Sequence, residues 1–184
     1  FNQIVDEYDK RHGINCDHLK EIAKINFANA RNNDNAQTRH WDLPEQCYTD
    51  SDAYNPIIEG KIRKMDCGQI TDGGACVFLA SEKAAREYAA ARQLRFEDIP
   101  RIKGWGHRSA PISLARKFAL SEGNPLIFPH VNQLMRDALA RAGMAQVTDL
   151  DGLETHDCFT ITEYMAIDHI GLTAPGESWK AITE

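Results

Sequence analysis

Apolar residues repeat with a helical period in four parts of the 184-residue chain. The first helix is predicted over residues 15–31, and the others over residues 81–89, 113–120 and 131–142. The last pattern is the most regular, and Gly143 follows it where a helix commonly ends. Its apolar stripe is formed by Val131, Leu134, Met135, Ala138, Leu139 and Ala142. We interpret this stripe as part of a hydrophobic core and not as a cofactor site.

Three short apolar runs between the helices indicate β-strands. Residues 73–80 begin with two glycines and continue as an unbroken run of mostly small apolar residues, which is typical of a strand buried on both faces. Residues 99–105 and 150–153 are predicted to form the other two strands. Strands that alternate with helices indicate an α/β fold. Because strands buried on both faces need neighbours, we expect the chain to form part of a larger sheet.

The composition is that of a globular protein, with 42% hydrophobic and 26% charged residues. The apolar runs are all too short to cross a membrane. The formal net charge is −6, and the charges are mixed along the chain, so a basic face for nucleic acid is not expected. The five cysteines are scattered without a CxxC pair, which argues against a zinc site and for reduced thiols in a cytosol-like compartment. We therefore expect no nucleic-acid, membrane or metal partner.

His156, Asp157 and Cys158 are consecutive and form the best candidate site. They precede a helix that Thr160 and Glu163 are predicted to open as a capping box. Three interpretations are open at this point. His156 can activate Cys158 as a nucleophile, or it can donate a hydrogen bond to a developing oxyanion while Cys158 lines a pocket. In the third interpretation the group is structural, with Asp157 capping the following turn while the other two side chains pack.

The stretch His156-Asp157-Cys158-Phe159 resembles the thiolase superfamily, in particular the sterol-carrier-protein-type thiolases and their bacterial and archaeal relatives. Other thiolases have Asn-Glu-Ala-Phe at this place. Residues 71–75 and 79–82 are similar to the family's Asp-Gly-Ala-Ala strand and the Ser-Glu that follows it. Residues 55–60 and 171–177 also fit the bacterial relatives. The resemblance runs through nearly all of the chain.

This resemblance implies a five-layered α/β/α/β/α fold of two similar halves, of which the chain would be a middle section. Residues 1–56 would be a helical segment of the loop domain that covers coenzyme A. Residues 57–95 would end the first half-domain, and residues 96–184 would begin the second. The implied activity is that of an acetyl-CoA acetyltransferase, which condenses or thiolyses acyl-CoA thioesters in lipid metabolism. The full-length protein would be a homodimer, cytoplasmic or, in a eukaryote, peroxisomal.

The resemblance also implies roles for single residues. His156 matches a position that stabilises the oxyanion or enolate of the thioester. Phe159 matches a residue of the pantetheine channel, and Gly68 and Gln69 align with a Ser-Gly pair that touches pantetheine. Asp157 would orient the turn. The implied substrate is a coenzyme A thioester, with no covalently bound cofactor.

Three catalytic motifs of the family are absent from this sequence. They are the acylated cysteine in its usual context, a Gly-His-Pro histidine and a Cys-x-Gly cysteine. Gly106-His107 is followed by Arg108 and therefore does not form the Gly-His-Pro motif. Cys158 replaces an alanine of other thiolases, so it would be a pocket residue. We therefore expect a fragment that is inactive by itself. Two alternatives stay open: a retro-aldolase or condensing subunit that works with a zinc-ribbon/OB-fold partner, and a non-catalytic CoA-binding or structural fragment.

Overall fold

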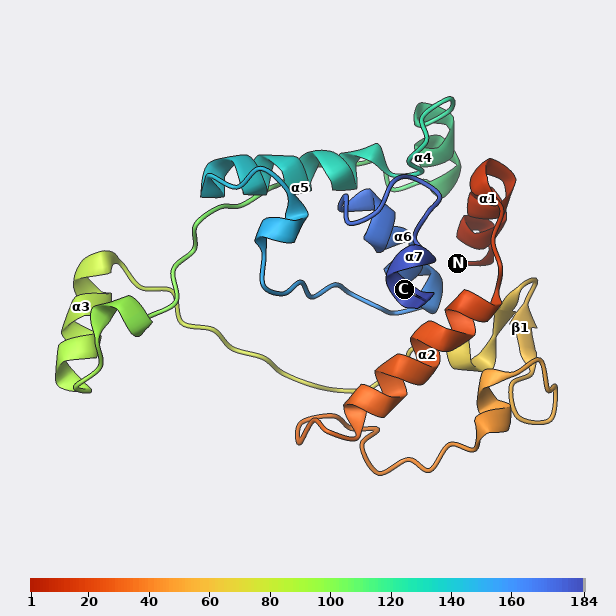
Figure 1. Ribbon diagram of the computed structural model, residues 1–184, viewed down its shortest axis with the longest axis horizontal. Helices are drawn as coiled ribbons and strands as arrows, with labels where there is room; N and C mark the ends of the chain where they lie inside the picture. Colours follow the sequence, from red (N-terminus) through yellow and green to blue (C-terminus); the bar gives the residue numbers. More distant parts are fainter. Residues whose placement is uncertain (184) are drawn as a thin grey trace.

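The computed structural model describes residues 1–183, in which seven α-helices are joined by long irregular segments (Figure 1). The helices are α1 (Asn2–His12), α2 (Asp17–Ala30), α3 (Glu82–Ala91), α4 (Leu114–Leu120), α5 (Pro129–Ala142), α6 (Thr160–His169) and α7 (Lys180–Thr183). Strands β1 (Ile57–Glu59) and β2 (Ile62–Arg63) pair antiparallel. Short 3-10 turns are η1 (Glu45–Tyr48), η2 (Lys64–Asp66), η3 (Phe96–Asp98) and η4 (Val147–Asp149).

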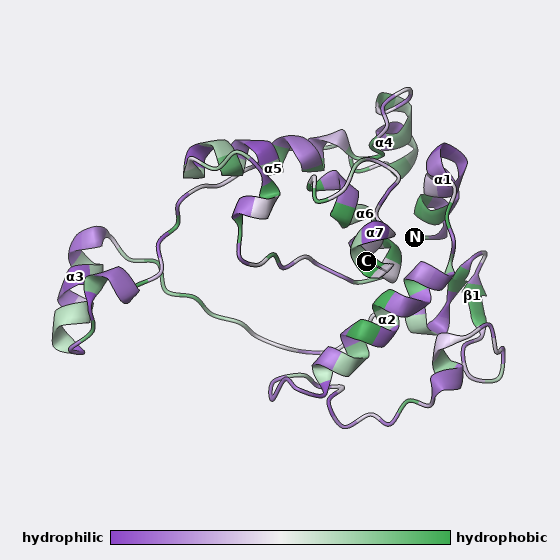
Figure 2. Ribbon diagram, viewed as in Figure 1, coloured by the Kyte–Doolittle hydropathy of each residue, from purple (hydrophilic) through white to green (hydrophobic). Residues whose placement is uncertain are grey.

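The four helices predicted from apolar periodicity are confirmed as α2, α3, α4 and α5. The Ser81 Oγ accepts a hydrogen bond from a backbone N–H in the first turn of α3, and Ser113 does the same for α4. Gly143 ends α5 with a left-handed φ of 73°. Hydrophobic and hydrophilic residues alternate along α2, as Figure 2 shows, because only one face of this helix is buried. Helix α1 was not predicted.

The three predicted strands are wrong as regular secondary structure. Residues 73–80, 99–105 and 150–153 have no strand partners, and β1–β2 is the only sheet within residues 1–183. The first two segments run to and from α3, which is set apart from the other helices (Figure 1). Phe78 is 95% exposed and Ile102 is 70% exposed. A strand with two apolar faces is stable only between neighbouring strands and covering layers, and the described residues supply none. The mixture of helices with a small sheet is that of a partial α/β fold.

The main hydrophobic core lies where α1, α2 and α6 meet, together with the segment before α5. Helix α6 packs against both α2 and α5. The most deeply buried apolar residues of this core are Val5, Tyr8, Leu19, Ile22, Ile127, Ile161 and Tyr164. Burial of each large apolar side chain contributes about 1.5–3 kcal/mol. This core places the amino-terminal end of α6, and with it the turn before α6, beside α2.

A buried polar network joins three parts of this core. Asp168 of α6 accepts hydrogen bonds from the Tyr8 hydroxyl at 2.8 Å and the Gly176 N–H at 2.9 Å. Its other oxygen lies 2.5 Å from His169 Nδ1. Because His169 Nε2 accepts the Phe128 N–H at 3.0 Å, the proton of a neutral ring is on Nδ1 and points to Asp168. The network therefore holds α1 and the start of α5 on α6.

Replacement of Tyr8 by phenylalanine is expected to lower the free energy of unfolding by about 1–2 kcal/mol. Burial raises the pKa of the Tyr8 hydroxyl far above its usual range, so it remains a donor at every accessible pH. The variant keeps the ring and loses only the donor to Asp168. Denaturant unfolding measures the change, with Tyr54→Phe as the control because Tyr54 is 49% exposed. Equal stability of the two variants would contradict this role of the network.

Candidate functional site

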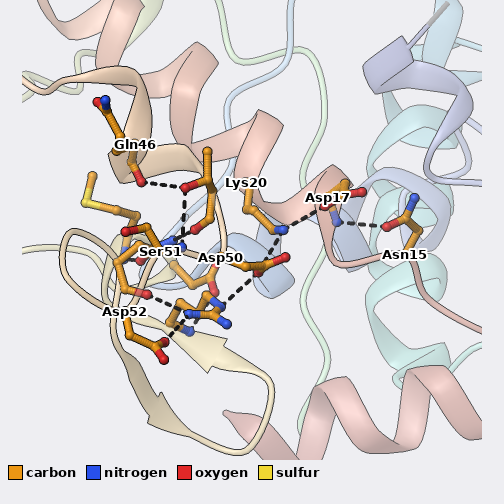
Figure 3. A network of polar contacts seen from close by, with 12 residues as sticks. Asn15, Asp17, Lys20, Gln46, Asp50, Ser51 and Asp52 are labelled. Carbon is orange, nitrogen blue, oxygen red and sulfur yellow. Dashed lines mark hydrogen bonds and ion pairs between the residues drawn. The ribbon is translucent and has the colours of Figure 1, made fainter.

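A charged network joins strand β2 and the loop at Asp50 to α2 (Figure 3). The Lys20 Nζ lies 2.7 Å from Asp17 Oδ1 and 2.9 Å from Asp50 Oδ1. Asp50 also lies 3.0 Å from the Nε of Arg63 in β2. The side chains of Lys20 and Arg63 are only 10% and 16% exposed, but the carboxylates of Asp17 and Asp50 are 71% and 67% exposed, so solvent still screens these ion pairs. The network holds Arg63 of β2, and η2 and the next site residues follow directly after it.

Residues 67–69 cross the turn before α6 directly after η2. Cys67 and Phe159 form an antiparallel bridge. The Gly68 N–H donates to the Cys158 carbonyl at 2.8 Å. A Cβ on residue 68 would lie 3.0 Å from that same oxygen, which is tighter than ordinary contact, so glycine allows the close approach. The structure thus brings Gly68 and Gln69 next to the turn that carries residues 156–159.

A cavity of about 310 Å³ opens where this crossing meets α2. Its apolar wall includes Ala23, Phe27 and Met65. Its polar wall includes Asn26, Asp66, Gly68, Gln69, Asp157 and Thr160. Three of the residues singled out from the sequence, at positions 68, 69 and 157, therefore line one cavity. Their roles toward a substrate stay predictions.

Two acidic residues, Asp66 and Asp157, line this cavity, and Glu163 lies close to Asp157. Asn26 donates its side-chain amide to Asp157 Oδ2 at 2.8 Å and to Glu163 Oε2 at 2.7 Å. Burial, and then the charge of Glu163 and a hydrogen bond with it, raise the pKa of Asp157 to about 7. Burial also raises the pKa of Asp66, although the Thr160 hydroxyl donates to it at 2.8 Å. The wall therefore holds a carboxyl group that exchanges its proton near neutral pH.

The other three predicted site residues lie in the same turn but do not line the cavity. His156 is exposed, and Cys158 is half-buried. Phe159 stacks on Phe1 with 3.8 Å between the ring centroids. Within residues 1–183, no hydrogen bond joins the side chains of His156 and Cys158. This geometry does not supply the base that the nucleophile interpretation requires.

The predicted capping box at the start of α6 is wrong. Phe159 occupies the N-cap position, and no side chain caps this end of the helix. Thr160 is the first helical residue, and its hydroxyl donates to the buried Asp66 instead. Glu163 accepts from Asn26 instead of reaching back to the helix start. A tertiary partner replaces each local hydrogen bond because the core brings α2 and η2 against this end of α6.

Other features of the described residues do not compete with this site. A larger hollow of about 710 Å³ lies beside α1 and the loop after α4. There Arg11 donates to the carbonyls of Ser121, Asn124 and Leu126, so its guanidinium is used to hold the loop. Across residues 1–183, no three His, Cys, Asp or Glu side chains are grouped to hold a metal ion. None of the described helices is both long and apolar enough to cross a membrane.

Known proteins resemble this chain along nearly its whole length. Residues 114–184 match the family model described as thiolase C-terminal domain-like. An acetyl-CoA acetyltransferase of Methanothermobacter thermautotrophicus is 27% identical over 176 residues, which cover 94% of this chain and 40% of that protein. These matches support a relationship to the thiolase superfamily. The resemblance deduced from the His156 stretch is thereby confirmed.

Two further relatives of this chain have related names. An acetyl-CoA acetyltransferase of Methanocaldococcus jannaschii is 21% identical over 182 residues, which cover 99% of this chain and 42% of that protein. Sterol carrier protein 2 of Oryctolagus cuniculus is 22% identical over 178 residues, 96% of this chain and 30% of that protein. The chain thus spans about two fifths of the length of the two acetyltransferases. No solved structure matches the chain.

The matched family model lies inside residues 96–184, the range predicted to begin the second half-domain, while the boundaries at residues 56 and 95 stay predictions. The fold class, a partial α/β thiolase-like arrangement, is confirmed. The apolar runs at 73–80 and 99–105 have the composition of internal strands without the sheet that would cover them.

Sequence reasoning missed the partners of the Asp157 carboxyl group. Asn26 lies on the predicted helix 15–31, outside its apolar stripe, and Glu163 was assigned to a cap. Asn26 is 131 residues from Asp157 in the sequence, and nothing local to either residue indicates that they meet. Only the packing of α2 on α6 brings them together.

Proposed function

We propose that this chain forms one wall of the thioester site in a thiolase-type acetyl-CoA acetyltransferase. The observation that carries this proposal is the cavity where Gly68, Gln69 and Asp157 meet. The names of the two archaeal relatives support the substrate class. The whole protein's activity is part of the proposal, because the chain spans only part of those relatives.

The cavity suits the pantetheine arm of coenzyme A. At about 310 Å³ it lies at the small end of ligand pockets, and it combines an apolar wall with a few polar groups. Gln69 is exposed at the rim, and its amide can both donate to and accept from the amides of pantetheine. Gly68 has no side chain to fill the entrance.

His156 is the group in this turn that is free to act on the thioester. Its ring is exposed and makes no hydrogen bond within the described part of the chain. A neutral imidazole has one N–H donor. In the proposed reaction this N–H donates to the thioester oxygen as negative charge develops on it, either in the enolate or in the tetrahedral intermediate. Cys158 is a pocket residue in this scheme, and the acylated nucleophile is supplied by another part of the protein.

The 184-residue chain is expected to bind coenzyme A weakly and to show no thiolysis of acetoacetyl-CoA. Isothermal titration with coenzyme A and an assay of thioester loss measure the two properties. Gly68→Val should weaken binding by at least about tenfold, equivalent to ~1.4 kcal/mol, because its side chain would enter the crossing. Gly74→Val is the matched control, since a Cβ at residue 74 meets nothing within 4 Å. Equal affinity in both variants would contradict the cavity as the binding site, and turnover would reveal a nucleophile in this chain.

A further inference from the structure

Asn26 links two carboxyl groups on opposite sides of the α6 amino terminus. Its single amide nitrogen donates to Asp157 Oδ2, in the turn before α6, and to Glu163 Oε2, in the first turn of the helix. Both distances are below 3 Å. The two oxygens are therefore held close together by one group from α2. This arrangement differs from the predicted cap, in which Glu163 serves α6 alone.

Two ionised carboxylates cannot occupy this place without repulsion. Like charges at such short range favour a state in which one carboxyl group keeps a proton. Asp157 Oδ1 is buried and has no hydrogen-bond partner within the described residues. An ionised Asp157 would carry negative charge on this buried oxygen, which no donor within residues 1–183 stabilises. Both observations favour a single proton shared between Asp157 and Glu163.

The charges on the surrounding elements strengthen this preference. Helix α6 contributes Glu163, η2 contributes Asp66, and α2 contributes the neutral Asn26. Among residues 1–183, no lysine or arginine forms an ion pair with Asp157 or Glu163. The Asn26 side-chain amide is the group that donates to both carboxyl groups and partly offsets their negative charge.

We propose that Asn26 is a positioning residue that holds Asp157 and Glu163 together around one shared proton and thereby fixes the His156 turn on α2. The position of Asp157 also affects the next residue, Cys158, whose carbonyl accepts a hydrogen bond from the Gly68 N–H. The position of the turn, the Gly68 hydrogen bond and the cavity wall thus depend on one proton. This proposal concerns the free chain and does not depend on a bound ligand.

The sign of the pH dependence follows from the direction of the shift. The pKa of Asp157 is raised to about 7, so the folded chain binds this proton more tightly than the unfolded chain. The contribution to stability is complete below the usual aspartate pKa and is lost as the pH rises toward 7. Above that pH both carboxyl groups are ionised and repel each other. The turn is then held less firmly.

Amide hydrogen exchange at Gly68 tests the proposal in the 184-residue chain. We expect protection of the Gly68 N–H at pH 6 and a loss of at least about tenfold at pH 8, after correction for intrinsic exchange. Asn26→Ala should lose this protection at both pH values. Glu163→Gln should retain it at both, because a neutral amide removes the repulsion. Asn29→Ala, an exposed asparagine on the same helix, should behave as the unmodified chain.

An NMR titration of the Asp157 carboxyl group distinguishes a positioning role of Asn26 from the simple loss of its hydrogen bond. If Asn26 positions the turn, Asn26→Ala lets the carboxyl groups separate, and Asp157 titrates closer to its usual pKa. If the geometry stays unchanged, loss of the Asn26 donor raises the pKa of Asp157 further, and the proposal is overturned. Unchanged Gly68 protection in Asn26→Ala at pH 6 overturns it as well. Circular dichroism of each variant shows that the helices are intact, and Glu163→Gln gives an independent result if Asn26→Ala does not fold.

Discussion

Substitution of Gly106 by alanine is expected to lower the free energy of unfolding by about 1–3 kcal/mol. Residues 104–106 run along α5 so closely that a Cβ on residue 106 would lie 1.9 Å from the Leu134 carbonyl oxygen. A Cβ on Gly104 would lie 2.1 Å from the Ala138 carbonyl oxygen. Both carbonyl oxygens belong to the backbone of α5, which cannot change rotamer to make room as a side chain can. The segment must therefore move away from α5.

Differential scanning calorimetry measures the effect of this substitution. For a chain of this size the melting temperature should fall by about 2–12 °C. Movement of the segment also removes the Arg141 side chain from the Trp105 ring, whose centroid lies 5.1 Å from it, so tryptophan fluorescence should change. Gly74→Ala is the control, since a Cβ there meets open space. If the two alanine variants melted at the same temperature, the packing of residues 104–106 on α5 would be refuted.

Replacement of His156 by alanine should reduce thiolysis of acetoacetyl-CoA by more than about a hundredfold in a complete acetyltransferase that carries this segment. The expected loss falls on kcat, because the imidazole N–H interacts with charge that develops only during the reaction. The exposed ring is not part of the hydrophobic core, so the fold should be unaffected. Steady-state kinetics with both substrates varied measures kcat and KM separately.

Glu154→Ala is the matched control for His156→Ala. Glu154 is exposed in the same turn and makes no hydrogen bond through its side chain within residues 1–183. It should retain the unmodified rate. Unchanged turnover in His156→Ala would remove this residue from the reaction, while the similarity to the thiolase superfamily would stand.

Local patterns predicted most of the helices and part of the site. Helices α2 to α5 follow from apolar residues that repeat every three or four positions, with Ser81, Ser113 and Gly143 marking their ends. The apolar repeat and the capping residues of a helix lie within a few positions of one another in the chain, so they can be recognised from the sequence alone. The same holds for the resemblance carried by the His156 stretch. The functional roles of residues 68, 69 and 156–159 are still to be tested.

The strands show the limit of such reasoning. Residues 73–80 have the composition of a buried strand, but a strand exists only when another one supplies hydrogen-bond partners. In this chain the segment is extended and Phe78 is almost fully exposed. The sequence pattern is typical of a strand that has neighbouring strands and covered faces, and residues 1–183 do not provide them. A composition typical of burial thus predicts a strand correctly only when the partner strands are also present.

The sequence by itself determined most of the helices, the resemblance to a family and the stretch in which the candidate site lies, because each depends on residues that are neighbours in the chain. Only the tertiary structure decided which groups meet there. Packing of α2 on α6 brings Asn26 to Asp157 and Glu163, and the Thr160 hydroxyl donates to Asp66 of η2 instead of capping the helix. Burial and like charge then raise the pKa of Asp157 to about 7. Desolvation and repulsion depend on distance in space, and separation along the chain does not encode that distance.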